Sequence, residues 1–99
     1  MNVQIAQARI RPEHVPHVRA AVAKVFAAIE SAQFEDVGFA WLVLADGETF
    51  VVVVRAEEGT RNPIPGLPEY RELQEGLEHW LAEPPDRQDL AVIGSYRLF

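Results

Sequence analysis

The chain of 99 residues contains no cysteine and few basic residues. The absence of cysteine excludes a disulfide framework, thiolate catalysis and cysteine-ligated zinc, and it suits a reducing compartment. Nine Lys and Arg stand against fifteen Asp and Glu, which gives a formal net charge of −6. Because this charge opposes binding to a phosphate backbone, we do not expect a nucleic-acid partner.

Long hydrophobic runs are also missing. The longest apolar stretch, Phe39 to Ala45, is far shorter than the roughly 20 residues that span a bilayer. The first residues show neither the basic start nor the apolar stretch of a targeting signal. We therefore expect a cytoplasmic protein without a membrane partner, folded as a single domain over residues 1–99 with a modest core.

Two segments carry apolar residues at the three- and four-residue spacing of one helical face. The first predicts a helix from about His14 to Ala32, in an alanine-rich background. The second begins at Pro68, which suits a first helical turn, and it stops before Pro84. The apolar stripes are Val15, Val18, Val22, Val25, Phe26 and Ile29 in the first helix, and Tyr70, Leu73, Leu77, Trp80 and Leu81 in the second.

Four segments rich in β-forming residues accompany the two helices. Strands are predicted at Val3–Arg11, at Gly38–Leu44, at Phe50–Val54 and at Leu90–Phe99. The dipeptide Asp46-Gly47 joins the middle two and favours a tight hairpin turn with positive φ at both residues. The order strand, helix, strand, strand, helix, strand predicts a ferredoxin-like α+β fold, in which both helices cover one face of a four-stranded antiparallel sheet.

The hairpin shows no alternation of apolar and polar residues, so both of its faces need a cover. If Asp46 and Gly47 form the loop, the numbers of paired residues sum to 93 and each strand divides into two faces. We expect the helices to cover the smaller aliphatic face, which leaves the aromatic face open for a sheet-to-sheet homodimer. The aromatic face holds Phe39, Trp41, Val43, Phe50 and Val52, and the aliphatic face holds Ala40, Leu42, Val51 and Val53.

With this element order, the strand ending Ala8-Arg9-Ile10-Arg11-Pro12, the hairpin at Asp46-Gly47 and a terminal strand, the sequence resembles the dimeric α+β barrel superfamily. Within it, the chain is most similar to the antibiotic-biosynthesis-monooxygenase-like and stress-responsive small domains. The resemblance implies two sheets packed face to face, a last strand that reaches toward the partner, and a pocket between each sheet and its helices.

Members of the superfamily include cofactor-independent oxygenases and haem-degrading enzymes. The haem-degrading members use an asparagine on the first strand together with a spaced tryptophan and histidine on the second helix. Here the first strand offers Gln4 and Gln7, while His79 and Trp80 are adjacent and point about 100° apart on a helix. The haem-degrading triad is therefore not expected.

Five side chains are candidates to line a pocket, and no catalytic constellation joins them. Trp41 and Arg9 would supply an aromatic wall and a cationic anchor, although Trp41 also suits a dimer core and Arg9 an ion pair with Glu57 or Glu58. His14 and His17 have the spacing that permits joint metal ligation, but nothing completes a site, so no metal or cofactor is expected. The candidates are Arg9, Phe39, Trp41, Tyr70 and His79.

Two classes of function remain open, and with them the question of whether the chain is an enzyme. The first is a small-molecule-binding or assembly domain whose partners are a second copy and a small aromatic or carboxylate ligand. The alternative is a cofactor-independent monooxygenase acting on an electron-rich, quinol-like aromatic. No phosphate-binding loop follows a strand, and no serine lies in a nucleophile motif, so nucleotide binding and serine hydrolysis lack support.

Overall fold

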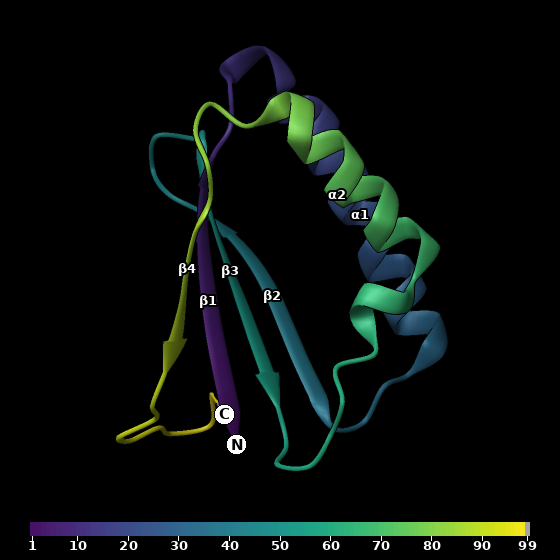
Figure 1. Cartoon of the computed structure of the whole chain (residues 1–99), viewed down its shortest axis with the longest axis vertical. Helices are drawn as coiled ribbons and strands as arrows, with labels where there is room; N and C mark the ends of the chain where they lie inside the picture. The colour runs from purple at the N-terminus through teal and green to yellow at the C-terminus, as the bar shows by residue number, and fades with distance from the viewer. Residues whose placement is uncertain (99) are drawn as a thin grey trace.

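The computed structural model describes residues 1–98 and has the layered α+β architecture that the element order predicts (Figure 1). Strands and helices follow one another in the expected order, with a short 3₁₀ turn before each helix. The elements are β1 (Asn2–Arg9), a 3₁₀ turn η1 (Pro12–His14), α1 (Val15–Ala32), β2 (Val37–Val43), β3 (Thr49–Ala56), a 3₁₀ turn η2 (Ile64–Gly66), α2 (Pro68–Trp80) and β4 (Asp86–Leu90).

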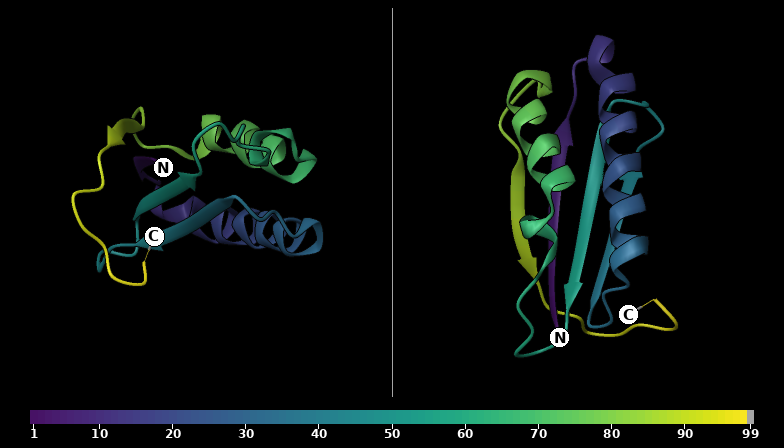
Figure 2. Two further views of the ribbon diagram at one scale, coloured as in Figure 1. Left: turned by 90° about the horizontal axis from the view of Figure 1, so that it is seen from below. Right: turned by 90° about the vertical axis from the view of Figure 1, so that its right-hand side faces the viewer.

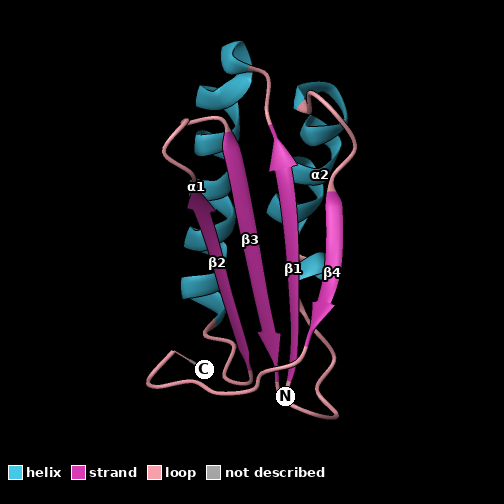
Figure 3. Ribbon diagram, turned by 90° about the vertical axis from the view of Figure 1, so that its left-hand side faces the viewer, coloured by secondary structure: helices cyan, strands magenta, loops and turns pink. Residues whose placement is uncertain are grey.

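The four strands form one sheet in the order β2-β3-β1-β4, and all three strand pairs are antiparallel. Both helices lie on the same face of this sheet, and the right-hand view of Figure 2 shows them side by side in front of it. The opposite face carries no helix, as the view in Figure 3 shows. The predicted ferredoxin-like arrangement is confirmed. The central question is what covers the face of the sheet that carries no helix in the described residues.

Proline and backbone geometry set the ends of the two helices. Pro16 lies in the first turn of α1, where its missing N–H costs no hydrogen bond. This helix ends at Gln33, whose left-handed φ of 52° turns its N–H back to the carbonyl of Ile29 at 2.9 Å. The helix α2 begins at Pro68 and ends where Leu81 becomes extended. The bounds of α1 and the start of α2 agree with the prediction, whereas α2 ends before the predicted stop at Pro84.

The hairpin between β2 and β3 has the predicted register, with Trp41 opposite Val52. Its loop is longer than two residues, because the closing hydrogen bond runs from the N–H of Leu44 to the carbonyl of Thr49 at 2.9 Å. The carboxylate of Asp46 accepts hydrogen bonds from the backbone N–H groups of residues 48 and 49 and from the Thr49 hydroxyl. These bonds hold the pKa of Asp46 below its usual value. Only glycine 47 takes the positive φ expected of both turn residues.

The prediction of which face stays open is wrong. The aromatic face of the hairpin packs beneath the helices, where Phe50 is buried and Trp41 contacts it with ring centroids 6.0 Å apart. The ring of Phe39 lies between the sheet and both helices, with Phe26 of α1 at 5.5 Å and Tyr70 of α2 at 6.3 Å. Large rings fill the layer between sheet and helices and bury the most area there.

The strand β1 extends both faces of the hairpin. Ala8 pairs with Phe50 and so shares the helix-covered face, whereas Arg9 pairs with Thr49 and shares the open one. The small side chains of β1 on the covered face leave room for the aromatic rings of the neighbouring strands. The central apolar residues of the open face are Ile5, Ala40, Leu42, Val51 and Val53.

The fourth strand is Asp86–Leu90, not the predicted Leu90–Phe99. It pairs with β1, with Val3 opposite Leu90, and all of its residues are exposed. A polar edge strand of this kind is held by backbone pairing and discourages unwanted strand addition. Residues 91–98 form no helix or strand, and Phe99 lies outside the described residues. The large apolar side chains that this segment exposes are Val92, Ile93, Tyr96 and Leu98.

A continuous core joins the sheet to both helices. Ile10, at the end of the first strand, is fully buried, as are Val18 of α1 and Leu73 of α2. Each such side chain stabilises the fold by about 1.5–3 kcal/mol relative to an exposed one. This packing orients the start of α1 and the end of α2, and side chains from both segments line grooves at the surface.

Candidate functional site

A groove of about 250 Å³ lies between α1 and the edge of the sheet formed by β2 and β3. This volume is slightly below the usual range for drug-sized ligands, so it suits a compound of about one ring. Most of its wall is apolar, and a single cation belongs to it. The lining residues are Arg19, Val22 and Ala23 from α1 and Trp41, Leu42, Val43 and Phe50 from the sheet.

Local structure explains why these side chains meet. Arg19, Val22 and Ala23 are three and four residues apart, so they lie on one face of α1. Trp41 and Phe50 lie on the covered face of the sheet and on neighbouring strands. They are diagonal neighbours, because Trp41 pairs with Val52, two residues after Phe50. Since α1 packs over this edge of the sheet, the basic side chain and the indole border the same space.

Arg19 and Trp41 are the described lining residues of this groove whose side chains carry a polar atom. The indole Nε1 of Trp41 is buried and has no hydrogen-bond acceptor among residues 1–98. Arg19 is exposed and forms no ion pair within the described part of the chain. No carboxylate lies among the lining residues. The groove is therefore electrostatically suited to an anion with an apolar body.

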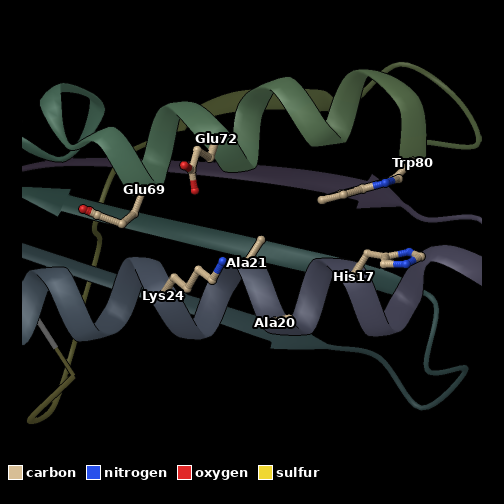
Figure 4. Close-up of a pocket in the computed structure, with 7 residues that line it drawn as sticks. All are labelled: His17, Ala20, Ala21, Lys24, Glu69, Glu72 and Trp80. Atoms are coloured by element: carbon tan, nitrogen blue, oxygen red, sulfur yellow. The ribbon is translucent and has the colours of Figure 1, made fainter.

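A second groove, of about 210 Å³, runs between the two helices (Figure 4). His17 and Trp80 stand at one end with their rings stacked at 5.8 Å. Lys24 stands toward the other end with two glutamates of α2. These charges have mixed signs, so the groove favours no single ligand charge. Its lining residues are His17, Ala20, Ala21, Lys24, Glu69, Glu72 and Trp80.

Gly76 explains the position of Trp80. A Cβ atom at residue 76 would lie 2.3 Å from the indole ring, a distance that no real packing allows. The indole therefore lies across the backbone of α2 at this glycine and presents its other side to His17. A glycine in a helix destabilises it by about 1 kcal/mol relative to alanine. At position 76 this cost is offset by the packing of the Trp80 ring, for which an alanine side chain would leave no room.

The structure gathers three of the five predicted site residues between the sheet and the helices. Phe39, Trp41 and Tyr70 all pack against the core in this layer, and burial raises the pKa of the Tyr70 phenol. Of these three, Trp41 lines the first groove. His79 is exposed, and it lines neither groove.

Arg9 lies on the open face of the sheet, opposite to Trp41, so the predicted pairing of these two residues is not formed. Its nearest acidic partner is Glu48, with the Arg9 Nε atom 3.9 Å from a carboxylate oxygen, rather than Glu57 or Glu58. The cation beside Trp41 is Arg19, which the sequence analysis missed. A signal was present, because Arg19 is three residues before Val22 of the apolar stripe.

The described residues, 1–98, contain no group of three or more potential metal-ligating side chains. His14 and His17 do approach each other, with their Nδ1 atoms 3.3 Å apart. No helix in this part of the chain is long and apolar enough to cross a membrane.

No protein-family model and no curated protein sequence matches the chain. Solved structures do match it in fold. A candidate antibiotic biosynthesis monooxygenase from Nitrosomonas europaea superposes with a TM-score of 0.75 and 17% identity, over 93% of this chain and 89% of that one. An antibiotic biosynthesis monooxygenase gives 0.74 and 15%, over 95% and 100%.

A further match is a protein from Mycobacterium tuberculosis, with a TM-score of 0.72 and 19% identity, over 95% of this chain and 96% of that one. Identities this low establish the shared fold alone, and the coverage extends over nearly the whole of each chain. The resemblance inferred from the sequence is thus confirmed at the level of architecture: this chain has the ferredoxin-like α+β fold of the antibiotic-biosynthesis-monooxygenase-like proteins.

Proposed function

We propose that this protein is a small-molecule-binding member of the α+β barrel fold that holds a small aromatic anion in the groove between α1 and β2. The observation that carries the proposal is the buried indole N–H of Trp41, a residue of the apolar groove, for which residues 1–98 provide no acceptor. A buried donor without a partner costs about 1–3 kcal/mol. A small shift of the indole that brings this N–H to a ligand oxygen in the groove would remove that cost.

Arg19 supports an anion as the ligand. Its guanidinium belongs to the same groove and is free of ion pairs with other described residues. A guanidinium and an indole N–H together match the two oxygens of a carboxylate, while the ring of the ligand would pack on Val22 and Phe50. An aromatic monocarboxylate combines these features at the volume available.

Binding is favoured over turnover by the composition of the groove. The cofactor-independent monooxygenase alternative needs a base that removes a proton from the phenolic substrate. The side chains described along the groove include no carboxylate, histidine or tyrosine.

The absence of cysteine suits a reducing compartment, and we propose the cytoplasm as the place of action.

We also propose that the binding unit is a homodimer formed through the open face of the sheet. This face presents a contiguous apolar centre, and a solitary copy would leave it in water. The exposed apolar side chains of residues 91–98 add further surface for a partner copy to cover. Most lining residues of the groove beside α1 lie on the other side of the sheet, and Leu42, on the edge strand β2, borders both surfaces. Dimerisation therefore leaves the α1 side of the groove accessible.

Tryptophan fluorescence tests the ligand. The variant Trp80→Phe makes Trp41 the sole reporter, because the chain has two tryptophans. Aromatic monocarboxylates such as benzoate and hydroxybenzoates are titrated against their neutral amides. We expect saturable changes with the acids, and we expect Arg19→Ala to weaken their binding by roughly 10- to 100-fold, the equivalent of one charge-assisted contact.

Arg9→Ala is the matched control, since it removes the same charge from the opposite face of the sheet. It should leave the affinity unchanged beyond a small salt-sensitive effect. Equal losses from Arg9→Ala and Arg19→Ala would show that only net charge matters. The absence of saturable binding to any acid of the panel would contradict the proposed function.

A further inference from the structure

The start of α1 brings two imidazoles together. His14 is the N-cap residue of this helix and His17 lies in its first turn, so both rings extend from the same side of the first turn. Their Nδ1 atoms are 3.3 Å apart and their ring centroids 5.4 Å apart. One ring donates its N–H to the other in this arrangement, at a distance that is long for a hydrogen bond.

The separation matches that of two ligand atoms on one metal ion. Two imidazole nitrogens bound tetrahedrally at about 2.05 Å from Zn²⁺ are about 3.3 Å apart. A metal ion between the rings would need both Nδ1 lone pairs, so the shared proton would move to Nε2 of the ring that now donates it. No net proton is released by two neutral imidazoles, and only a modest turn of each ring is required.

Contacts hold the His17 ring and the backbone of His14 before any metal arrives. His17 stacks on Trp80 with an interplanar angle of 18°, and Trp80 itself is seated on Gly76. The backbone N–H of His14 donates to the carbonyl of Arg11 at 2.9 Å, which orients the cap residue. Such support lowers the entropic cost of chelation, as partners of metal ligands do in established sites.

We propose that His14 and His17 form a two-histidine chelating site for a divalent metal ion that prefers imidazole, zinc(II) or copper(II). The separation of the two nitrogens suits tetrahedral zinc(II) directly, whereas square-planar copper(II) requires them to approach to about 2.8 Å. Neutral imidazole nitrogen suits these ions, whereas magnesium and calcium require oxygen ligands. Residues 1–98 provide no third ligand close enough for a closed structural site. Solvent therefore completes the coordination, and the ion is exchangeable.

Trp80 supplies the readout, because copper(II) at His17 would quench an indole stacked on that ring. In a Trp41→Phe background, Trp80 is the sole tryptophan, and copper(II) chloride is titrated at neutral pH in metal-free buffer. We expect saturable quenching at one equivalent, reversal by a chelator, and competition by zinc chloride. The amino terminus, another copper ligand, lies at the far end of β1 and is too distant to quench Trp80 (Figure 1).

His14→Ala is the decisive variant, because it removes one ligand and leaves the stack of His17 on Trp80. We expect its apparent affinity for copper to fall by about 100-fold, the low end of the gain when a second ligand becomes intramolecular. His79→Ala is the matched control, since it removes a histidine beside Trp80 that takes no part in the pair. It should bind copper as the parent does.

Circular dichroism establishes that each variant is folded, and His14→Gln replaces His14→Ala if the latter is not. Electron paramagnetic resonance of the copper complex should show coupling to two nitrogen nuclei in the parent and to one in the His14 variant. Unchanged affinity in the His14 variant, equal loss in His79→Ala, or quenching that does not saturate would each overturn the two-histidine site.

Discussion

Lysine substitutions at two adjacent residues of β3 test which face of the sheet carries the dimer. Val52 lies opposite Trp41 on the face that the helices cover, and Val53 lies opposite Ala40 on the open face. Both valines are half-buried in a single copy, so the two substitutions are matched in chemistry and in initial exposure. They differ in what covers each side chain, because the helices lie over Val52 and the proposed partner copy lies over Val53.

The expected magnitudes follow from the surroundings. A lysine at position 52 would enter the layer between sheet and helices, where an unpaired charge costs about 3–5 kcal/mol. That is a large part of the total stability of about 5–15 kcal/mol typical for a domain. A lysine at position 53 reaches water in the separate chain and changes the stability of the monomer by roughly 0.5 kcal/mol. In the dimer each copy contributes one such lysine, so the combined cost of about 6–10 kcal/mol weakens association by roughly four to seven orders of magnitude.

Sedimentation velocity at micromolar concentration and thermal denaturation together separate the two effects. We expect the parent chain to sediment as a dimer, Val53→Lys to sediment as a folded monomer, and Val52→Lys to lose thermal stability or aggregate. A monomeric parent chain would refute the proposed dimer. A folded, monomeric Val52→Lys beside a dimeric Val53→Lys would refute the assignment of the interface to the open face.

Two further outcomes follow from the helix α2. Gly76→Ala should displace Trp80 and destabilise the fold by up to about 2 kcal/mol in urea denaturation, because overpacking outweighs the helix propensity gained. Stabilisation by about 1 kcal/mol would instead show that the Trp80 ring is free to move. Tyr70 should ionise above the ordinary tyrosine pKa in an alkaline absorbance titration, since burial raises the pKa of Tyr70. The protonated form is favoured in the folded state, so stability is intact below the ordinary pKa of 10.0 and falls as the pH rises through the higher folded value. Tyr70→Phe should abolish this late phase, and a late phase that persists in that variant would contradict the burial argument.

Local patterns were sufficient for most of the fold. The period of the apolar stripe predicted α1 and the start of α2 almost to the residue, because proline marks these helix starts. The end of α2 lies at Trp80, a few residues before the predicted stop at Pro84. The hairpin register was also predictable. Leu44 and Thr49 close the turn, and this pair fixes which residues of β2 and β3 lie opposite each other along the whole hairpin. In contrast, β4 was misplaced, because a solvent-exposed edge strand has no hydrophobic pattern to mark it.

The sequence by itself determined the order of elements, the architecture that follows from it, and which residues of the hairpin share a face. It did not determine which face the helices cover, because both faces of β2 and β3 are apolar. Tertiary structure decided that question, since the space between sheet and helices takes the large rings of Phe39 and Phe50. The same decision moved Arg9 away from Trp41 and brought Arg19 to it, because residues distant in sequence meet only when α1 packs on the sheet.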